Sequence, residues 1–178
     1  MDYFKLVVTG AVNSGKTTFV RTISEIDPIT TDELVTEGSV KQLKTYTTVA
    51  MDYGRRTIDD DIVLHIYGTP GQERYYFSWD VLAEGAFGVI FLADSTSMES
   101  ISTTKNIIKY FHERYTMPYL LCVTKLDNPG SIGYNEVLKQ IDRPELFAMQ
   151  CMPTKIEDVQ NALITLLTLA IDQEENAL

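Results

Sequence analysis

The segment from Gly10 to Thr17 limits the fold of this chain more than any other feature. It reads GAVNSGKT and matches the pattern G-x-x-x-x-G-K-[ST] in full. A run with strand character, Tyr3–Thr9, precedes the motif, and a helical pattern, Gly15–Ser24, follows it. A strand, a glycine-bearing loop and a helix in this order form the start of a βαβ unit. The motif therefore predicts an α/β fold with a parallel sheet.

The same segment predicts a phosphate-binding loop. Its glycines allow consecutive backbone N–H groups to turn toward phosphate oxygens, and the helix N-terminus adds the positive end of its dipole. Lys16 can reach the β- and γ-phosphates of a nucleotide, and the Thr17 hydroxyl can bind Mg²⁺. The alternative is a glycine turn followed by a lysine by chance, which the flanking strand and helix disfavour. The predicted nucleotide contacts from this loop are Asn13, Ser14, Gly15, Lys16, Thr17 and Thr18.

The rest of the chain alternates short apolar runs with amphipathic segments, which is the pattern of repeated βαβ units. Further strands are predicted at Thr48–Ile58, Ile62–Tyr67, Ala86–Ala93, Tyr119–Val123 and Leu146–Cys151. Further helices are predicted at Met98–Tyr115, Asn135–Ile141 and Ile156–Ile171, and at the end of a loop over Gly68–Glu84. The acidic turn at 59–61 predicts an antiparallel hairpin between the strands that flank it. The expected architecture is a six-stranded, mostly parallel sheet with about five helices distributed over both faces.

Length and charge limit the number of domains and the class of partner. The chain has 178 residues, which suits a single domain over 1–178. It carries 15 Lys and Arg residues against 25 Asp and Glu residues, so its formal net charge is −10. Binding to nucleic acid or to anionic lipid relies on basic surface charge, and this balance argues against both. A polyanion is therefore expected to bind locally, through backbone amides and a few well-placed cations.

The sequence predicts no membrane anchor. The N-terminus lacks the charged and apolar regions of a signal peptide, and residue 2 is Asp rather than the Gly of N-myristoylation. The longest apolar run, near Leu163–Ile171, is too short to span a membrane. Cys122 and Cys151 lie far apart in sequence, which disfavours a disulfide scaffold and suits a reducing compartment. We therefore expect a cytoplasmic protein.

The tetrapeptide T-K-x-D at Thr124–Asp127 follows a buried strand and predicts which base is bound. Guanine presents its N1–H and N2–H₂ donors side by side, and one carboxylate can accept from both. Adenine has no matching pair of donors, so Asp127 favours guanine. Lys125 can lay its stem over the purine and reach back to the phosphate loop. The alternative is an ordinary loop after a strand, which the presence of the phosphate loop disfavours.

The phosphate loop, Gly71-Gln72-Glu73 and T-K-x-D occur in the order and at the spacing of small GTPases. Over nearly all of its 178 residues, the chain resembles a Ras-superfamily small GTPase. The resemblance implies a P-loop NTPase fold of the small G-domain type. It also implies GTP and GDP as ligands together with Mg²⁺, and slow hydrolysis of GTP.

Two departures from the family pattern lie at the base site. Thr124 replaces the usual Asn of N-K-x-D, so a contact to guanine N7 or to the phosphate loop is expected to be shortened or lost. Cys151-Met152-Pro153 stands in place of the family motif S-A-K. The family contact to guanine O6 is made by a backbone N–H, and the N–H of Met152 is expected to provide it here.

The resemblance also implies two segments that respond to the γ-phosphate. Thr48, with Thr47 beside it, is assigned to sensing the γ-phosphate and Mg²⁺. The alternative is an ordinary run of β-forming residues, which would show the same pattern. Gly71 is expected to contact the γ-phosphate through its N–H, and Gln72 to orient the attacking water. The implied catalytic residues are Gln72, Lys16 and Thr48, and the implied Mg²⁺ ligands are Thr17 and Thr48.

Gly68 stands where the family motif D-x-x-G has its aspartate. Because that carboxylate supports Mg²⁺, its loss is expected to weaken the Mg²⁺ dependence of binding. The core Thr69-Pro70-Gly71-Gln72 is similar to the MglA-type polarity GTPases of gliding motility, a prokaryotic subgroup that also lacks the aspartate. This subgroup resemblance implies a Roadblock-type dimer as regulator or effector.

Two further groups of side chains near these segments are candidates for function. Arg55, Arg56 and Arg74 are possible arginine fingers, although a hairpin position favours solvated surface charges for Arg55 and Arg56. Four aromatic residues in five positions are interpreted equally as a partner-binding surface or as packing on the next helix; these residues are Tyr75, Tyr76, Phe77 and Trp79.

Three functions are compatible with these motifs. The first is a molecular switch that binds GTP and GDP and hydrolyses GTP slowly. The second is a pseudo-GTPase, a binding module without useful hydrolysis, which Gly68, Thr124 and the segment 151–153 motivate. The third is a small P-loop kinase or ATPase, which Asp127 disfavours because it selects guanine.

Overall fold

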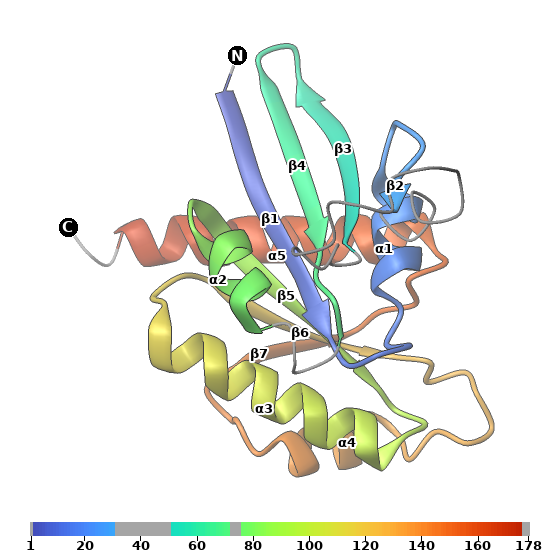
Figure 1. Cartoon of the computed structure of the whole chain (residues 1–178). Coiled ribbons are helices and arrows are strands. Elements are labelled where there is room, and N and C mark those ends of the chain that lie inside the picture. The colour runs from blue at the N-terminus through green and yellow to red at the C-terminus, as the bar shows by residue number, and fades with distance from the viewer. Residues whose placement is uncertain (1, 31–50, 72–75, 176–178) are drawn as a thin grey trace, which may run out of the picture.

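A twisted sheet of seven strands organises the computed structural model, which describes residues 2–30, 51–71 and 76–175 (Figure 1). The strands are β1 Asp2–Gly10, β2 Ile29–Thr30, β3 Asp52–Asp59, β4 Ile62–Gly68, β5 Ala86–Asp94, β6 Tyr119–Thr124 and β7 Phe147–Gln150. The helices are α1 Lys16–Ile23, α2 Tyr76–Ala83, α3 Met98–Arg114, α4 Tyr134–Ile141 and α5 Ile156–Glu175. The strand order across the sheet is β2-β3-β4-β1-β5-β6-β7.

The predicted six-stranded, mostly parallel sheet is confirmed. Strands β4, β1, β5, β6 and β7 pair in parallel, and β3 pairs antiparallel with β4, as the acidic turn predicted. One short strand was not predicted, because the two residues of β2 are too few to show a period. They pair antiparallel with the start of β3 and extend the edge of the sheet. Residues 48–50 of the predicted strand Thr48–Ile58 lie outside the described residues.

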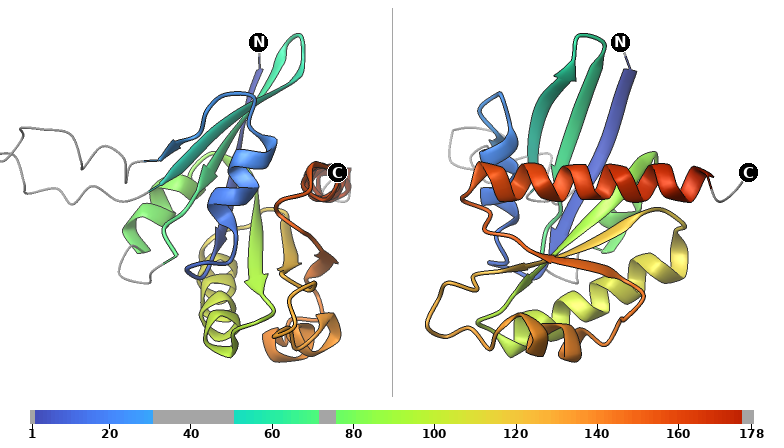
Figure 2. Two further views of the ribbon diagram at one scale, coloured as in Figure 1. Left: turned by 90° about the vertical axis from the view of Figure 1, so that its right-hand side faces the viewer. Right: turned by 180° about the vertical axis from the view of Figure 1, so that it is seen from behind.

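Two apolar cores lie on the two faces of the sheet because side chains alternate along each strand. In β1, Leu6 and Val8 pack with α1 and α5, whereas Val7 packs with α2, α3 and α4. In Figure 1, α5 passes behind the sheet, and Figure 2 shows it from that side. Because both faces are covered, β5 and β6 are mainly apolar and end in the polar residues Asp94 and Thr124, as expected for buried parallel strands.

The aromatic residues near the start of α2 do not share one role. Trp79 is fully buried, stacks near Phe111 and donates its indole N–H to Pro70 O at 3.1 Å. Packing is therefore the correct interpretation for Trp79. Phe77 is exposed, and Tyr75 and the Tyr76 side chain lie outside the described residues.

The parallel strands place their carboxyl ends along one edge of the sheet. The loops that follow β1, β4, β5 and β6 therefore come together there. In open α/β sheets this edge is where ligands bind. The phosphate loop, the segment 69–71 and T-K-x-D all belong to these loops.

Candidate nucleotide site

The backbone of the phosphate loop turns through three left-handed residues. Gly10 has φ 145°, Asn13 has φ 64° and Gly15 has φ 106°. Gly15 caps α1, and a Cβ at this position would lie 2.9 Å from Pro153 Cγ, so only glycine fits without movement. Successive turns of this kind direct backbone N–H groups into one concave surface that attracts anions.

Lys16 is the buried cation of this loop. Its side chain is 8% exposed, and its Nζ donates to Gly10 O at 2.9 Å and to Ala11 O at 2.6 Å. Burial lowers the pKa of Lys16 to about 8, and the neighbouring Asp52 carboxylate opposes that shift. An ammonium has three donors, so Lys16 keeps donor capacity for an anion.

The loop has the features that a chain of phosphates requires. Ser14 Oγ is buried and has no hydrogen-bond partner among the described residues. Gly71 approaches the loop so closely that a Cβ on it would lie 2.5 Å from Val12 N and 2.8 Å from Lys16 Nζ. Gly71 is thus placed beside the cation, as its predicted contact to the γ-phosphate requires. The segment is held there by Thr69, whose N–H donates to Val8 O at 2.9 Å.

Asp52 is a residue of this site that the motifs did not reveal. It is the first residue of β3 and is 7% exposed. Its Oδ2 accepts a hydrogen bond from Thr17 Oγ1 at 2.6 Å. The pair joins a hydroxyl and a carboxylate, which are oxygen groups of the kind that Mg²⁺ prefers. The described residues contain no group of three or more His, Cys, Asp and Glu side chains able to hold a metal, so phosphate and water oxygens would complete this site.

The T-K-x-D segment lies next to the phosphate loop and is tied to it. Thr124 Oγ1 lies 3.0 Å from Ser14 O, to which it donates, so the contact to the loop is present despite the replacement of Asn. Lys125 has φ 58°, and its Nζ forms an ion pair with Asp94 Oδ2 at 2.6 Å. Thr96 also donates to Asp94 through its N–H and its hydroxyl. Burial raises the pKa of Asp94, but the hydrogen bonds from Lys125 and Thr96 outweigh burial and lower the pKa below its usual value.

Two hollows at this edge meet at Lys125, which lines both. One, of about 360 Å³, is lined by the phosphate loop, Gly71 and the start of α3. The other, of about 410 Å³, is lined by Lys125, Asp127, Asn128, Pro129, Met152, Pro153 and Thr154. The predicted base residues Lys125, Asp127 and Met152 are therefore brought together beside the phosphate loop.

The N–H of Met152 has a partner within the chain. It donates to Asp158 Oδ2 at 2.8 Å, in the first turn of α5. The N–H expected to contact guanine O6 is thus engaged by a carboxylate, which the sequence pattern did not predict. A base that used this donor would have to compete with Asp158.

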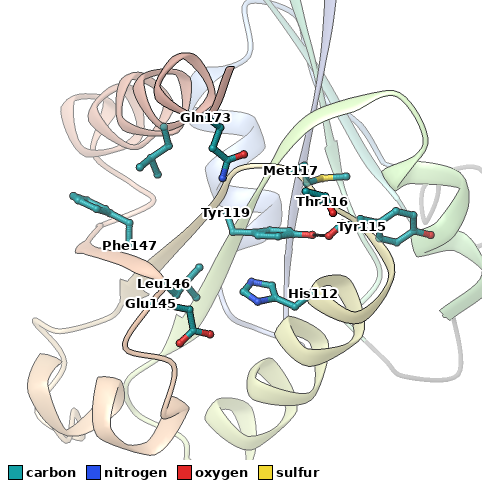
Figure 3. A pocket seen from close by; sticks show the side chains of 10 residues that line it. His112, Tyr115, Thr116, Met117, Tyr119, Glu145, Leu146, Phe147 and Gln173 are labelled. Carbon is teal, nitrogen blue, oxygen red and sulfur yellow. Dashed lines mark hydrogen bonds between the residues drawn. The ribbon is translucent and has the colours of Figure 1, made fainter. Parts of the chain in front are cut away.

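A third hollow, of about 390 Å³, lies away from these loops, near the amino ends of β6 and β7 (Figure 3). His112 and Tyr119 stack there with ring centroids 4.3 Å apart. Tyr119 donates its hydroxyl to Tyr115 O at 2.7 Å at the end of α3, and burial raises its pKa to about 12. None of the predicted nucleotide contacts lines this hollow.

Several predicted residues are not placed at the site. Gln72, Thr48 and Arg74 lie outside the described residues, so their roles stay predictions. Arg55 is exposed on β3, where its Nε pairs with Glu25 Oε1 at 2.9 Å. This position agrees with the interpretation of Arg55 as a surface charge.

Comparison with known proteins supports nucleotide binding at the level of the family. A family model described as "Conserved hypothetical ATP binding protein" matches residues 8–175. The uncharacterized protein MJ1339 of Methanocaldococcus jannaschii is 34% identical over 136 residues, which are 76% of this chain and 78% of that protein. Human Rab-8B, a Ras-related protein, is 32% identical over 116 residues, 63% of this chain and 50% of Rab-8B.

The mutual gliding-motility protein MglA of Myxococcus xanthus is 28% identical over 100 residues, 52% of this chain and 51% of MglA. The chain thus spans about half the length of MglA and of Rab-8B. The family match covers the phosphate loop, the segment 69–71 and T-K-x-D. The chain therefore belongs to the family described as conserved hypothetical ATP-binding proteins and is homologous to the Ras-like small GTPases.

Proposed function

We propose that this protein is a guanine-nucleotide switch that binds GTP and GDP with Mg²⁺ and hydrolyses GTP slowly. One observation carries the proposal. Residues 11–13 of the anion-binding loop line one hollow, the carboxylate of Asp127 lines the other, and the two hollows meet at Lys125. The loop suits phosphates and the carboxylate suits a base, so the two hollows together suit a purine nucleotide.

Guanine rather than adenine fits the base end, although the family description names ATP. Asp127 lines the hollow with an acceptor, and a base with two adjacent N–H donors satisfies it. An adenine ring would leave this carboxylate without its donors, which costs free energy wherever the site is closed to water.

Hydrolysis would depend on placement and charge rather than on covalent chemistry. Lys16 would bind the β- and γ-phosphates, the Gly71 N–H would meet the γ-phosphate, and Gln72 would orient water. Thr17 and Thr48 would hold Mg²⁺, which when bound neutralises charge on the phosphates. Arg55, which is paired with Glu25, is not free to meet the γ-phosphate, and this position agrees with slow hydrolysis in the absence of a partner.

A partner of the MglA-type switches, a Roadblock-type dimer, is proposed to bind beside the segment 69–71. Phe77 and Val81 occupy successive turns of α2 and are 57% and 67% exposed. Trp79 links the same helix to Pro70, so movement of the segment would reach this surface. The described residues contain no helix long and apolar enough to cross a membrane.

The partner proposal can be tested by titrating a purified Roadblock-type protein from the same genome into GDP-loaded and GTP-analogue-loaded protein. We expect tighter binding in the GTP-analogue form and weaker binding for Phe77→Asp. Ile171→Asp, an exposed apolar residue on α5, serves as the matched control. Equal binding of both loaded forms would rule out a nucleotide-dependent partner of this kind.

The second candidate is the pseudo-GTPase, which the glycine at position 68 favours. Hydrolysis measured over many turnovers separates it from the switch. A switch is expected to convert more than one equivalent of GTP per protein, and Gln72→Ala is expected to slow that conversion. Binding of GTP with no turnover would establish the binding module instead. Equal rates for the parent and Gln72→Ala would remove the role assigned to Gln72.

A further inference from the structure

We propose that Asp52, on β3, supplies the carboxylate that supports Mg²⁺ in this protein, in place of a carboxylate at the end of β4. The inference rests on the proposed function, because the cation would be bound together with the nucleotide phosphates. It assigns a metal-supporting role to a residue that lies in none of the nucleotide motifs.

Asp52 contacts the threonine of the phosphate loop, Thr17. P-loop NTPases hold Mg²⁺ with the Ser or Thr of the loop and with an aspartate from a neighbouring strand. Here the loop hydroxyl, Thr17 Oγ1, donates to Asp52 Oδ2 at 2.6 Å. A hydroxyl that donates its hydrogen keeps both lone pairs for other partners. Asp52 therefore leaves the Thr17 oxygen available to a cation and supplies negative charge beside it.

Asp52 also occupies the space beside Gly68. Asp52 and Gly68 are paired directly across β3 and β4. A Cβ at position 68 would lie 3.0 Å from Asp52 Cβ and 3.1 Å from Asp52 Oδ2. The Asp52 side chain thus fills the space that a side chain at position 68 would need. A side chain at position 68 would require Asp52 to move by a few tenths of an ångström, so glycine at 68 suits aspartate at 52.

The neighbouring carboxylates Asp94 and Asp127 have other roles. Asp94 is bound by Lys125 and Thr96 at the end of β5. Asp127 lines the base hollow. Asp52 by contrast faces the loop threonine and acts electrostatically on Lys16. Its burial at 7% exposure keeps this charge close to the phosphate loop with little screening by solvent.

The arrangement makes a prediction about which segment the cation controls. Asp52 lies four positions after Thr48, the other proposed support of Mg²⁺. Both groups would then come from one stretch of chain leading into β3. Of the described residues after β4, Gly71 is the one assigned to the γ-phosphate, through its N–H, so Mg²⁺ would hold β3.

The experiment measures release of a fluorescent GDP as Mg²⁺ is titrated from EDTA to millimolar concentration. The test variant is Asp52→Asn, which removes the charge but keeps an oxygen that can accept from Thr17. The matched control is Asp59→Asn, an exposed aspartate at the far end of the same strand. The exchange variant Asp52→Gly with Gly68→Asp moves the carboxylate to the paired position.

Asp52→Asn is expected to need about 10 to 100 times more Mg²⁺ than the parent for half of the maximal slowing of GDP release. Metal affinity typically falls by this factor when a residue that orients a metal ligand is lost. In EDTA, the same variant is expected to hold GDP at least as well as the parent, because one negative charge near the phosphates is gone. Asp59→Asn is expected to match the parent in both conditions. The exchange variant is expected to recover most of the Mg²⁺ response.

Four results would overturn the inference. The first is that Asp52→Asn needs the same Mg²⁺ concentration as the parent for half of the maximal slowing of GDP release. This result would leave the proposed nucleotide binding intact. Equal weakening of GDP binding in EDTA and in Mg²⁺ would show a structural role instead. If Asp52→Asn fails to fold, the exchange variant decides, and loss of its Mg²⁺ response would count against the transfer of the carboxylate. Failure of the parent itself to bind GDP would overturn the proposed function and this inference with it.

Discussion

The two ends of the parallel strands differ in what they hold. At the carboxyl ends, two non-glycine residues, Asn13 and Lys125, have left-handed backbone, and the charged groups Lys16 and Asp52 are buried. At the amino ends of β6 and β7, aromatic rings dominate, with His112 stacked on Tyr119 beside a hollow. One sheet therefore carries a polar, strained end and an aromatic, packed end.

The difference shows how the fold separates binding from stability. A non-glycine residue held in a sparsely populated backbone region costs about 1–3 kcal/mol, and such costs gather where a ligand is to be met. Stacked aromatic side chains stabilise instead, by about 0.5–1.5 kcal/mol per pair beyond their buried area. Substitutions at the carboxyl ends should therefore change ligand affinity most, and those at the amino ends should change unfolding.

The largest expected effect is that of Lys16→Met at the carboxyl ends. Loss of charge-assisted hydrogen bonds to phosphate should cost about 3 kcal/mol, which is roughly a 100-fold loss of GDP affinity. The ligand-free protein should also lose stability, because Gly10 O and Ala11 O lose their donor and the buried Asp52 loses a neighbouring cation. Binding titration and thermal unfolding test both statements, with Lys139→Met on exposed α4 as control. GDP affinity equal to that of the control would place the phosphates elsewhere.

A smaller and opposite pattern is expected for Tyr119→Phe at the amino ends. The hydroxyl that donates to Tyr115 O is lost, which should lower the free energy of unfolding by about 1 kcal/mol. GDP affinity should equal that of the parent, because Tyr119 lines only the distant hollow. Denaturant unfolding and GDP titration on the same samples give the two values. A loss of affinity without a loss of stability would break the division between the two ends.

The aromatic end should also respond to pH. Burial, with a further effect of Arg143, holds the pKa of His112 below its usual 6.5, although Glu145 opposes the shift. As the pH falls through 6.5, the unfolded chain takes up this proton before the folded protein does, so stability decreases. His112→Phe keeps an aromatic ring against Tyr119 and should flatten this part of the curve of unfolding free energy against pH. Identical curves for parent and variant would show that His112 does not contribute.

The smallest expected effect is that of Arg55→Ala, which lies at neither end of the strands. Arg55 pairs with Glu25 on the exposed side of β3. An arginine finger contributes about 10³- to 10⁵-fold to hydrolysis, so a role in catalysis would be plain in the rate. We expect an unchanged rate of GTP hydrolysis without a partner. A drop of that size would require Arg55 to reach the γ-phosphate.

The fold followed from the sequence more fully than the site did. The glycine motif and the apolar runs predicted the parallel strands, because burial on both faces leaves a continuous apolar pattern. The two residues of β2 have no such pattern. The contacts of Thr124 to Ser14 O and of Met152 to Asp158 Oδ2 could not be predicted, because they depend on packing between distant segments.

Asp52 shows where a further signal was available. The acidic turn of the hairpin centres on Asp60. Asp52 lies eight residues before this centre and Gly68 lies eight residues after it, so the two residues are expected to pair. They pair in the structure. The register therefore places a carboxylate opposite the glycine that replaces the usual aspartate. A motif read along one strand does not detect this exchange, because the compensating residue lies on the neighbouring strand.

The central claim is that the site selects guanine nucleotides, and competition binding tests it most directly. Fluorescent GDP bound to the parent protein is displaced by unlabelled GTP or ATP in the presence of Mg²⁺. Asp127 loses a pair of charge-assisted hydrogen bonds with adenine, so ATP is expected to need at least about 100 times the concentration of GTP. Displacement by ATP at the same concentration as GTP would contradict the account and establish an adenine-nucleotide site.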